Sequence, residues 1–388
     1  MRKIRMGMIG GGMDSFIGAV HRMAAVMDGH IEMVCGALSS TPERSQKSGT
    51  LLGLDPSRIY SDYEEMIRKE KALPDGERMD FVCIVTPNNL HFGPAKLALE
   101  NGFHVMSDKP MTYNLKEAVE LVHLVEKTGL VFGLTHNYTG YPMVKQARAM
   151  VRNGELGKIR KIAVEYFQGW LATKLEDTDH KQAGWRTDPK QSGAANCMGD
   201  IGTHAENLAE YITGLKIESL CADLTSFVSG RTLEDDGNVL LRFEGGAKGT
   251  LLATQVAVGE ENGLKIRIYG EKGGLEWAQQ EPNSLRINWL DKPYEVMRTG
   301  TNFNRFAPTA VSASRLPSGH PEGFIEAFAN LYKNFALTLK AKMEGREPDQ
   351  EHLDFPTVYD GARGMAFIET VVDSSKSPEK WVKFKRYI

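Results

Sequence analysis

The chain has 388 residues, of which 41% are hydrophobic and 25% are charged, with a formal net charge of −3 at pH 7. These values are ordinary for a globular protein, and a length above about 300 residues favours two domains over one. Basic residues form no dense run, which argues against a nucleic-acid partner. No apolar run reaches the roughly 20 residues of a membrane-spanning helix. The N-terminal segment leads into a strand-like run rather than a signal peptide, so we expect a cytoplasmic protein with no membrane partner.

Short apolar runs and amphipathic helices alternate in the first third of the chain. The runs predict strands at residues 4–9, 31–38, 81–85, 104–106 and 131–134. The clearest helix covers 115–127, where Asn114 and Glu117 form a capping-box pattern and Gly129 follows the end. Such alternation is typical of a parallel sheet with helices on both faces.

Strands dominate after about residue 137. They are predicted at 159–167, 219–227, 238–243, 249–258, 264–269 and 285–289. Consecutive strands without helices between them indicate an open, mostly antiparallel sheet in a second, α+β domain. Helices are expected at 144–152, 201–213, 322–344 and 358–374, and a long loop at 292–321. We place the domains at 1–137 and 138–354, with a C-terminal helix at about 355–375 that packs back on the first domain.

A glycine-rich turn joins the first strand to the first helix. Gly10, Gly11 and Gly12 end the strand, but the third glycine of a G-x-G-x-x-G pattern is displaced from Ser15 to Gly18. Such a turn allows backbone N–H groups and a helix N-terminus to bind a pyrophosphate. The candidate contacts are Gly10, Gly12, Phe16 and Ile17, and the alternative is an ordinary glycine-rich turn.

The end of the second strand carries no acidic residue. Ser39 and Ser40 stand there, and Arg44 follows. An acid at this place recognises the ribose of NAD, whereas small hydroxyls and an arginine accept the 2′-phosphate of NADP. The sequence therefore favours acceptance of NADP, and the alternative is that the two serines cap the helix that begins near Pro42.

Two further loops follow strands of the predicted parallel sheet, where ligands of such sheets bind. One is Thr86-Pro87-Asn88-Asn89-Leu90-His91 and the other is Ser107-Asp108-Lys109-Pro110. Lys109 next to the proline can donate a hydrogen bond to a substrate hydroxyl. The alternative is a solvated surface lysine.

Asp200 and His204 lie four residues apart at the start of a predicted helix and therefore share a face. Histidine is the natural base for a hydroxyl proton near neutral pH, and a carboxylate can orient it. The alternative is an aspartate N-cap with an incidental histidine.

The ordered set of motifs resembles the Gfo/Idh/MocA oxidoreductases, the family of glucose–fructose oxidoreductase and inositol 2-dehydrogenase. The matching segments are residues 10–12 with 18–21, 86–91, 108–110, 135–138, 185–186, 200–204 and 269–274. Asp108 stands where the family usually has glutamate. The resemblance implies a Rossmann domain followed by a domain with an open antiparallel sheet.

The resemblance also implies roles for individual residues. Lys109, Asp200 and His204 are expected to surround the oxidised hydroxyl, with the nicotinamide in the cleft between the domains. The further cofactor contacts are Thr86, Pro87, Asn88, His91, Asp108, Lys109, Asn137, Trp185 and Arg186. Candidate substrate contacts besides the three catalytic residues are Tyr166, Trp170, Arg186 and His320, since aromatic and polar side chains suit a polyhydroxylated ring. A homodimer or homotetramer through the open sheet is expected.

The four cysteines are scattered, and histidine and cysteine form no close cluster. The sequence therefore predicts neither a disulfide framework nor a metal site. The leading interpretation is an NAD(P)-dependent dehydrogenase that oxidises a hydroxyl of a sugar, sugar derivative or inositol-like polyol. Two alternatives are a redox-assisted glycosidase and a nucleotide-sensing regulator on the same fold.

Overall fold

The computed structural model describes residues 2–300 and 306–387. The chain divides into two compact units. The first comprises Met1–Asn137 and Phe324–Ala362, and the second comprises Tyr138–Gly323 and Arg363–Ile388.

The first unit contains a parallel sheet of five strands in the order β2-β1-β3-β4-β5. The strands are β1 (Ile4–Gly10), β2 (Ile31–Ala37), β3 (Phe81–Val85), β4 (His104–Ser107) and β5 (Phe132–Leu134). Residues of β3 are buried on both faces, as a parallel sheet covered by helices requires. The predicted Rossmann-type parallel sheet is confirmed, and every predicted strand of this region forms.

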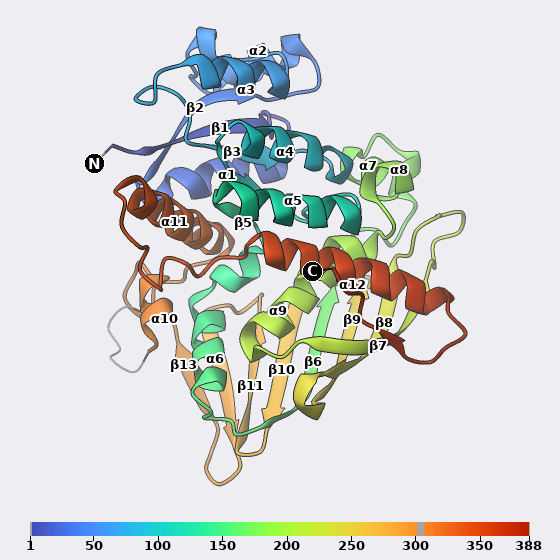
Figure 1. The fold of residues 1–388 in the computed structure, drawn as a ribbon. Coiled ribbons are helices and arrows are strands. Elements are labelled where there is room, and N and C mark those ends of the chain that lie inside the picture. The colour runs from blue at the N-terminus through green and yellow to red at the C-terminus, as the bar shows by residue number, and fades with distance from the viewer. Residues whose placement is uncertain (1, 301–305, 388) are drawn as a thin grey trace. The chain divides into compact units, whose positions relative to one another are not determined.

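Helices cover this sheet (Figure 1). They are α1 (Phe16–Met27), α2 (Pro42–Leu51), α3 (Tyr63–Ala72), α4 (Phe92–Glu100), α5 (Leu115–Thr128) and α11 (Phe324–Met343), with the 3₁₀ turns η1 (Pro56–Arg58) and η2 (Asn88–Leu90). The predicted cap of α5 is present, because Asn114 Oδ1 accepts from Glu117 N at 3.0 Å. Gly129 ends the helix in the left-handed region at φ 67°, which glycine adopts without steric cost.

Helix α11 belongs to the first unit, although most of the second unit precedes it in the sequence. We placed residues 322–344 in the second domain, but α11 belongs to the first unit and packs against α1. Its buried side chains include Phe328, Tyr332 and Phe335, which join the core formed by β1, β3 and α1. An apolar helix buries its stripe against whichever surface accepts it, and sequence order does not determine that surface.

The second unit contains a sheet of nine strands in the order β13-β12-β11-β10-β6-β9-β8-β7-β14. The strands are β6 (Ile159–Phe167), β7 (Ile217–Thr225), β8 (Asp236–Phe243), β9 (Lys248–Thr254), β10 (Gly263–Gly270), β11 (Gly273–Ala278), β12 (Ser284–Trp289), β13 (Glu295–Arg298) and β14 (Val382–Lys383). The pairings are antiparallel except for β6 with β9, which is parallel. The mostly antiparallel second sheet is therefore confirmed.

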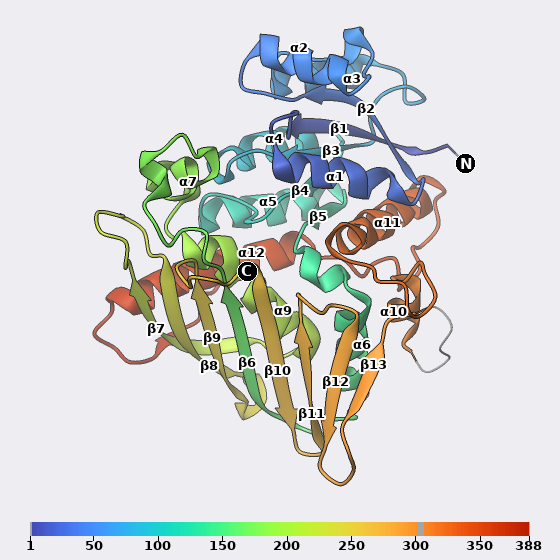
Figure 2. The same ribbon diagram turned by 180° about the vertical axis from the view of Figure 1, so that it is seen from behind.

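One face of this sheet is covered and the other is open. Helices α6 (Pro142–Arg152) and α9 (Thr203–Thr213) lie over one face, and Figure 2 shows the opposite face with no helix over it. Alternate residues of β6, such as Ile162, Val164 and Tyr166, are buried toward the helices. The residues between them, such as Glu165, point to the open face.

The predicted loop at 292–321 contains two short elements that the sequence pattern did not reveal. They are β13 and α10 (Pro308–Ser312), and residues 301–305 of the predicted loop lie outside the described residues. Strand β11 was also missed, because its glycine-rich start lacks an alternating apolar pattern.

The last helix, α12 (Val358–Lys376), is divided between the units at Ala362. In its first part, Gly361 packs against Met111 of the first unit. In its second part, Arg363 binds Glu210 of α9 with Nη2 at 2.6 Å from Oε1, and Ser374 accepts from Ala222 N of β7. The prediction that this helix packs back on the first domain therefore describes its beginning.

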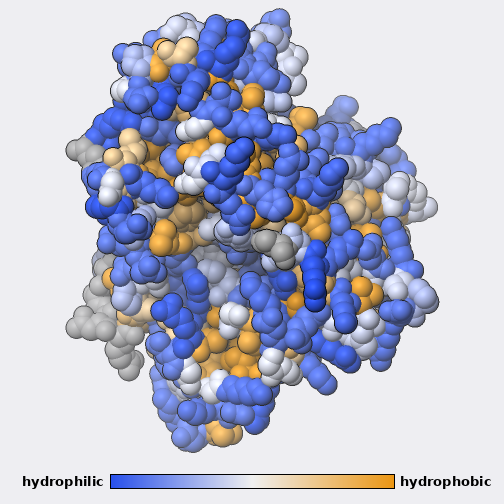
Figure 3. Space-filling view, in the orientation of Figure 1, coloured by the Kyte–Doolittle hydropathy of each residue, from blue (hydrophilic) through white to orange (hydrophobic). Residues whose placement is uncertain are grey.

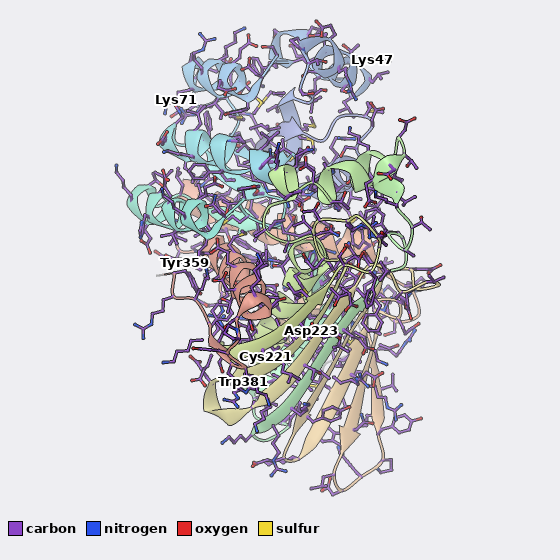
Figure 4. The ribbon with its side chains drawn as sticks, turned by 90° about the vertical axis from the view of Figure 1, so that its right-hand side faces the viewer. Lys47, Lys71, Cys221, Asp223, Tyr359 and Trp381 are labelled. Carbon is purple, nitrogen blue, oxygen red and sulfur yellow. The ribbon has the colours of Figure 1, made fainter. Side chains whose placement is uncertain are left out.

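The described helices include none that is both long and apolar enough to span a membrane. Figure 3 shows mainly polar residues on the visible face, with apolar residues scattered among them. The four cysteines are free. Cys35 and Cys83 are fully buried core residues, whereas Cys221 is half-buried on β7, where Figure 4 labels it with Asp223.

Candidate active site

The glycine turn after β1 packs so tightly against its neighbours that Gly10 and Gly18 leave no room for a side chain. Gly10 has φ 75°, and a Cβ there would lie 2.4 Å from Val85 O. A Cβ on Gly18 would lie 2.4 Å from Gly11 O. The displaced Gly18 thus allows the start of α1 to approach the turn, which is the function of a third glycine in the standard pattern.

Helix α1 begins at Phe16, directly after the turn. The N-cap Ser15 accepts from Gly18 N at 3.1 Å. Phe16 is 73% exposed, whereas Ile17 packs against the hydrophobic core. The turn therefore presents backbone groups and the start of a twelve-residue helix to a ligand, which suits a pyrophosphate.

Ser39 and Ser40 follow β2, and Ser40 is exposed. The N-cap of α2 is Thr41, not a serine, and its side chain makes no cap hydrogen bond. The alternative that the two serines cap this helix is therefore wrong. Arg44 Nη2 lies 3.1 Å from Asp14 Oδ2, and both side chains are exposed. An exposed pair of this kind is weak, about 0–1 kcal/mol, so Arg44 can exchange Asp14 for another anion.

The loop after β3 is held by His91. This ring is buried, with Nε2 at 2.8 Å from Thr86 O and Nδ1 at 2.7 Å from Pro110 O. His91 therefore connects the loops after β3 and β4, whereas we predicted it as a direct cofactor contact. Thr86 and Pro87 are half-buried and Asn88 is buried in η2.

Asp108 and Lys109 follow β4 at the same edge of the sheet. Asp108 Oδ1 accepts from Lys109 N at 2.9 Å and from Thr135 Oγ1 at 2.8 Å. Burial opposes ionisation of Asp108, but the neighbouring His21, Lys109 and His91 and the Thr135 hydrogen bond outweigh it and lower its pKa. The carboxylate thus fixes the backbone at Lys109, whose peptide bond to Pro110 is cis.

His136 and Asn137 follow β5 at this edge. Burial, together with the nearby charge of Lys109, lowers the pKa of His136 to about 3, so the ring is neutral. Asn137 is buried, and its Nδ2 has no hydrogen-bond partner in the structure. An unsatisfied buried donor is costly, so an amide or phosphate of a bound nucleotide would be a suitable acceptor. With the glycine turn, this atom indicates that the residues of the first unit fit a dinucleotide.

In the second unit, Asp200 lies in the π-helical turn η5 (Met198–Gly202) and His204 in the first turn of α9. Asp200 Oδ2 accepts from Arg186 Nε at 3.2 Å and from Gln255 Nε2 at 2.8 Å. Arg186 ends α7 (Lys181–Arg186). The carboxylate is thus oriented by one cation and one amide, and the expected position of both residues on one helix is observed.

Two tyrosines and one asparagine form a closed ring of hydrogen bonds beside His204. Tyr166 Oη donates to Asn262 Oδ1 at 2.6 Å, Asn262 Nδ2 donates to Tyr138 Oη at 3.1 Å, and the two hydroxyls are in contact. Burial raises the pKa of both tyrosines, so they stay protonated. The Tyr138 ring meets the His204 ring edge to face at 4.8 Å.

The hydrogen-bond network continues across the end of the sheet. Gln168 Nε2 donates to Asn262 Oδ1 at 2.8 Å, and Trp170 Nε1 donates to Gln168 Oε1 at 3.0 Å. Tyr166 and Trp170, both predicted substrate contacts, therefore belong to one network with Asn262. Amide and hydroxyl groups of this kind can bind the hydroxyls of a polyol.

Two other predicted residues have local contacts. Trp185 Nε1 donates to Gln182 Oε1 at 3.2 Å, and its ring lies 4.5 Å from the Arg186 guanidinium. His320 is exposed, and its Nδ1 lies 3.2 Å from Pro317 O in the same turn. This contact lies within the turn of His320 itself and involves neither Asp200 nor His204.

Sequence reasoning missed Gln168, Gln255 and Asn262. All three lie just beyond the ends of β6, β9 and β10, at one edge of the sheet. The register of the strands brings them together, and this register depends on the parallel pairing of β6 with β9. Gln168 directly follows the strand predicted at 159–167, which was the available signal, whereas Gln255 fell inside the strand predicted at 249–258 and Asn262 precedes β10.

Comparison with known proteins agrees with this geometry. Residues 4–136 match the family described as "Oxidoreductase family, NAD-binding Rossmann fold", and residues 144–276 match the "GFO/IDH/MocA C-terminal domain". An uncharacterized oxidoreductase of Bacillus subtilis (strain 168), YfiI, is 34% identical over 387 residues, which are 99% of this chain and 98% of the relative. The chain belongs to the Gfo/Idh/MocA family of oxidoreductases.

Solved structures of the family match over the whole chain. An oxidoreductase from Sinorhizobium meliloti has 45% identity and a TM-score of 0.89, with 99% of this chain and 100% of that chain covered. An inositol dehydrogenase homolog from Azotobacter vinelandii complexed with NAD+ has 36% identity and a TM-score of 0.93, with 99% and 98% covered. A second structure of that homolog, complexed with NADH and myo-inositol, has 35% identity and a TM-score of 0.90, with the same coverage. This Gfo/Idh/MocA chain is therefore an oxidoreductase with an NAD-binding Rossmann domain.

Within residues 2–300 and 306–387, no group of three or more His, Cys, Asp or Glu side chains is arranged to hold a metal ion.

Proposed function

We propose that the protein is an NAD(P)-dependent dehydrogenase that oxidises a hydroxyl of an inositol-like polyol, a sugar or a sugar derivative. The observation that carries this proposal is the pair of Asp200 and His204 on one helix, with Asp200 held by Arg186 and Gln255. The nearby network of Tyr166, Gln168 and Asn262 offers donors and acceptors for several hydroxyls. The relative complexed with NADH and myo-inositol supports the choice of a polyol.

In this proposal each polar residue has a defined role. His204 takes the hydroxyl proton, and Asp200 orients His204 and balances its charge. Lys109, held by Asp108, donates a hydrogen bond to the oxygen of the same hydroxyl. A nicotinamide bound beside these residues would supply the acceptor for the hydride from the same carbon. Gly10, Gly12 and the start of α1 hold the pyrophosphate, and Asn137 Nδ2 donates to the nucleotide.

We infer that NAD(H) is used and that NADP(H) is also accepted. The relatives are complexed with NAD+ and NADH, which supports the first cofactor. The exposed Ser40 and the weakly paired Arg44 support the second, because neither would repel a 2′-phosphate.

We also propose a homo-oligomer formed through the open face of the second sheet. Outward residues of this face include the exposed Leu240, Tyr269 and Val296. Charged pairs lie between them, such as Lys265 with Glu276 at 3.2 Å. A second copy could bury the apolar side chains and pair the charged ones. Light scattering of the purified protein tests this, and a monomer at all concentrations would reject it.

The decisive experiment is a screen of inositols, aldoses and sugar acids with NAD+ and with NADP+, followed at 340 nm. We expect net formation of reduced cofactor with at least one cyclic polyol or sugar, and none with His204→Ala. The exposed His123→Ala on α5 is the matched control and should keep wild-type activity. Cleavage of aryl glycosides without net reduction would indicate a glycosidase, and cofactor binding without turnover of any compound would indicate a regulator.

A further inference from the structure

A buried glutamate from a distant part of the chain, Glu234, contacts the start of the helix that carries Asp200 and His204. The first amide groups of a helix lack partners within it and must be satisfied elsewhere. Glu234 Oε2 accepts from Asn196 N at 3.1 Å, and Oε1 accepts from Met198 N at 2.9 Å. The Glu234 carbonyl accepts from Cys197 N at 3.2 Å. One residue thus satisfies three consecutive amide groups.

This contact leads directly to Asp200. Asp200 N donates to Asn196 O at 2.8 Å, an α-type bond between residues four apart that ties Asp200 to the residue held by Glu234. The Met198 side chain fills the space beside two glycines, because a Cβ on Gly237 would lie 2.5 Å from its Sδ and a Cβ on Gly202 would lie 2.8 Å from its Cε. The start of the helix is therefore fixed by both hydrogen bonds and packing.

The segment that presents Glu234 is itself anchored. Asp235 is fully buried and accepts from Phe227 N and Arg231 Nη1, both at 2.9 Å. The buried Arg231 guanidinium also binds Glu176 through two bonds of 2.8 Å. The segment next to Glu234 is therefore fixed by a buried network of ion pairs and hydrogen bonds.

We propose that Glu234 is a positioning residue of the reaction, whose carboxylate fixes the start of the catalytic helix and thereby orients Asp200 and His204. The proposal rests on the proposed function. Glu234 acts on Asp200 and His204 through the amide groups of Asn196 and Met198. Both oxygens are needed as acceptors, so the ionised form is the effective one.

This arrangement predicts sensitivity to pH. Burial raises the pKa of Glu234 to about 7, although the amide hydrogen bonds oppose this. The titratable groups around it are Cys197 and Asp200 on the helix, and Asp235 and Asp236, which follow Glu234 directly in the chain, with Asp235 neutralised by Arg231. Protonation turns one of the two oxygens into a hydroxyl, which is a weaker acceptor, so one of the two amide hydrogen bonds weakens as the pH falls through about 7.

The test compares Glu234→Gln and Glu234→Asp with a matched control. Glu322 is also buried and accepts two backbone N–H groups, from Arg315 at 2.6 Å and Leu316 at 2.9 Å, both on Oε1, so Glu322→Gln replaces a buried carboxylate elsewhere in the second unit. Hydrogen–deuterium exchange of peptides covering residues 196–204 is measured at pH 6 and pH 8, corrected for intrinsic rates. We expect E234Q to raise exchange there by about tenfold, as the loss of a charge-assisted hydrogen bond implies, and E322Q to leave it unchanged.

The catalytic part is tested with the polyol found in the screen. We expect E234Q to lower kcat by about tenfold with KM and the Kd of NADH changed less than about twofold, because orientation is lost but binding is kept. E234D keeps the charge. Compared with E234Q, it should therefore show a higher kcat, and its kcat should again rise as the pH increases through about 7. Raised exchange with wild-type kcat and pH profile would overturn the positioning role, and unchanged exchange would overturn the contact itself.

Two further measurements keep the result independent of the proposed function. If E234Q does not fold, the wild type alone must show higher corrected exchange at residues 196–204 at pH 6 than at pH 8, and equal exchange would reject the proposal. If no polyol is oxidised, the proposed function fails, but an NMR titration of the His204 ring still decides. E234Q must shift that titration and E322Q must not.

Discussion

Gln255 Nε2 lies 2.8 Å from Asp200 Oδ2, and Gln255 is fully buried. A neutral amide directly after β9 therefore holds the carboxylate of the proposed catalytic pair. Arg186 contributes the other contact at 3.2 Å. Both contacts are made to the same oxygen, Oδ2, so each of them contributes to the direction of the carboxylate.

Replacing Gln255 by leucine tests this contact. Gln255→Leu keeps the side-chain bulk but removes the donor, and we expect kcat to fall by about tenfold with little change in KM, because the carboxylate loses one orienting bond. Gln191→Leu is the matched control, since Gln191 Nε2 donates to Asp188 Oδ2 at 2.9 Å outside the catalytic helix. Steady-state kinetics of both variants decide, and equal losses in the two would show that the Asp200 contact has no special role.

The three candidate catalytic residues should affect the chemical step. We expect Lys109→Ala and His204→Ala each to lower kcat by about 10²- to 10⁴-fold, the usual contribution of acid–base groups, while the Kd of NADH stays near the wild-type value. Asp200→Asn should cost less than His204→Ala because the base remains. The double variant should lose less than the product of the single losses if the two residues handle one proton.

The pH profile of oxidation provides a second measurement on the same variants. The wild-type rate should rise through an ionisation that His204→Ala removes. A near-normal kcat with an unchanged profile in His204→Ala would show that another group is the base.

Ser40 is expected to determine the tolerance for a 2′-phosphate. Ser40→Asp should weaken NADPH binding by at least about tenfold and leave NADH binding equal or tighter, since a carboxylate repels the phosphate but accepts from the 2′-hydroxyl. Fluorescence titration of both reduced cofactors measures this. Wild-type binding of NADPH that is already tenfold or more weaker than binding of NADH would contradict the inference that NADP(H) is accepted.

His104 should make the protein less stable in mild acid. Burial, with the charge of Lys342, lowers its pKa to about 4, and its neutral Nδ1 accepts from Val131 N at 2.9 Å. The unfolded chain binds a proton below about pH 6.5, so stability is present above that pH and falls as the pH drops toward 4. The loss is at most about 3 kcal/mol. Urea unfolding at several pH values between 4 and 7 measures the free energy of unfolding. We expect this free energy to depend less on pH in His104→Asn than in the wild type, because asparagine keeps an acceptor without titrating.

Removal of metal ions should leave the activity intact. The described residues offer no cluster of three or more metal-binding side chains, and acid–base groups alone can move the hydroxyl proton. Exhaustive chelation followed by the cofactor-reduction assay tests this. Loss of activity that a divalent ion restores would reject the proposed chemistry.

The sequence predicted the parts of the fold that depend on local patterns. The five strands of the first sheet, the capped helix α5 and the spacing of Asp200 and His204 all follow from periodicity and capping over a few residues. The placement of α11 did not follow, because it depends on which distant surface accepts its apolar side. Contacts of Gln255 and Glu234 also join positions far apart in the chain, and no local pattern encodes them.

The parallel pairing of β6 with β9 also has a kinetic consequence. Gln168 and Gln255 follow these two strands and are separated by 87 positions, so the centre of the sheet closes only after a long stretch of chain has been ordered. That stretch contains α9 and Glu234. Loop closure over such a distance is slow and cooperative. We therefore expect the second unit to refold slowly, with activity recovered no earlier than its sheet, because Gln168, Gln255 and Asp200 come together only when β6 and β9 pair.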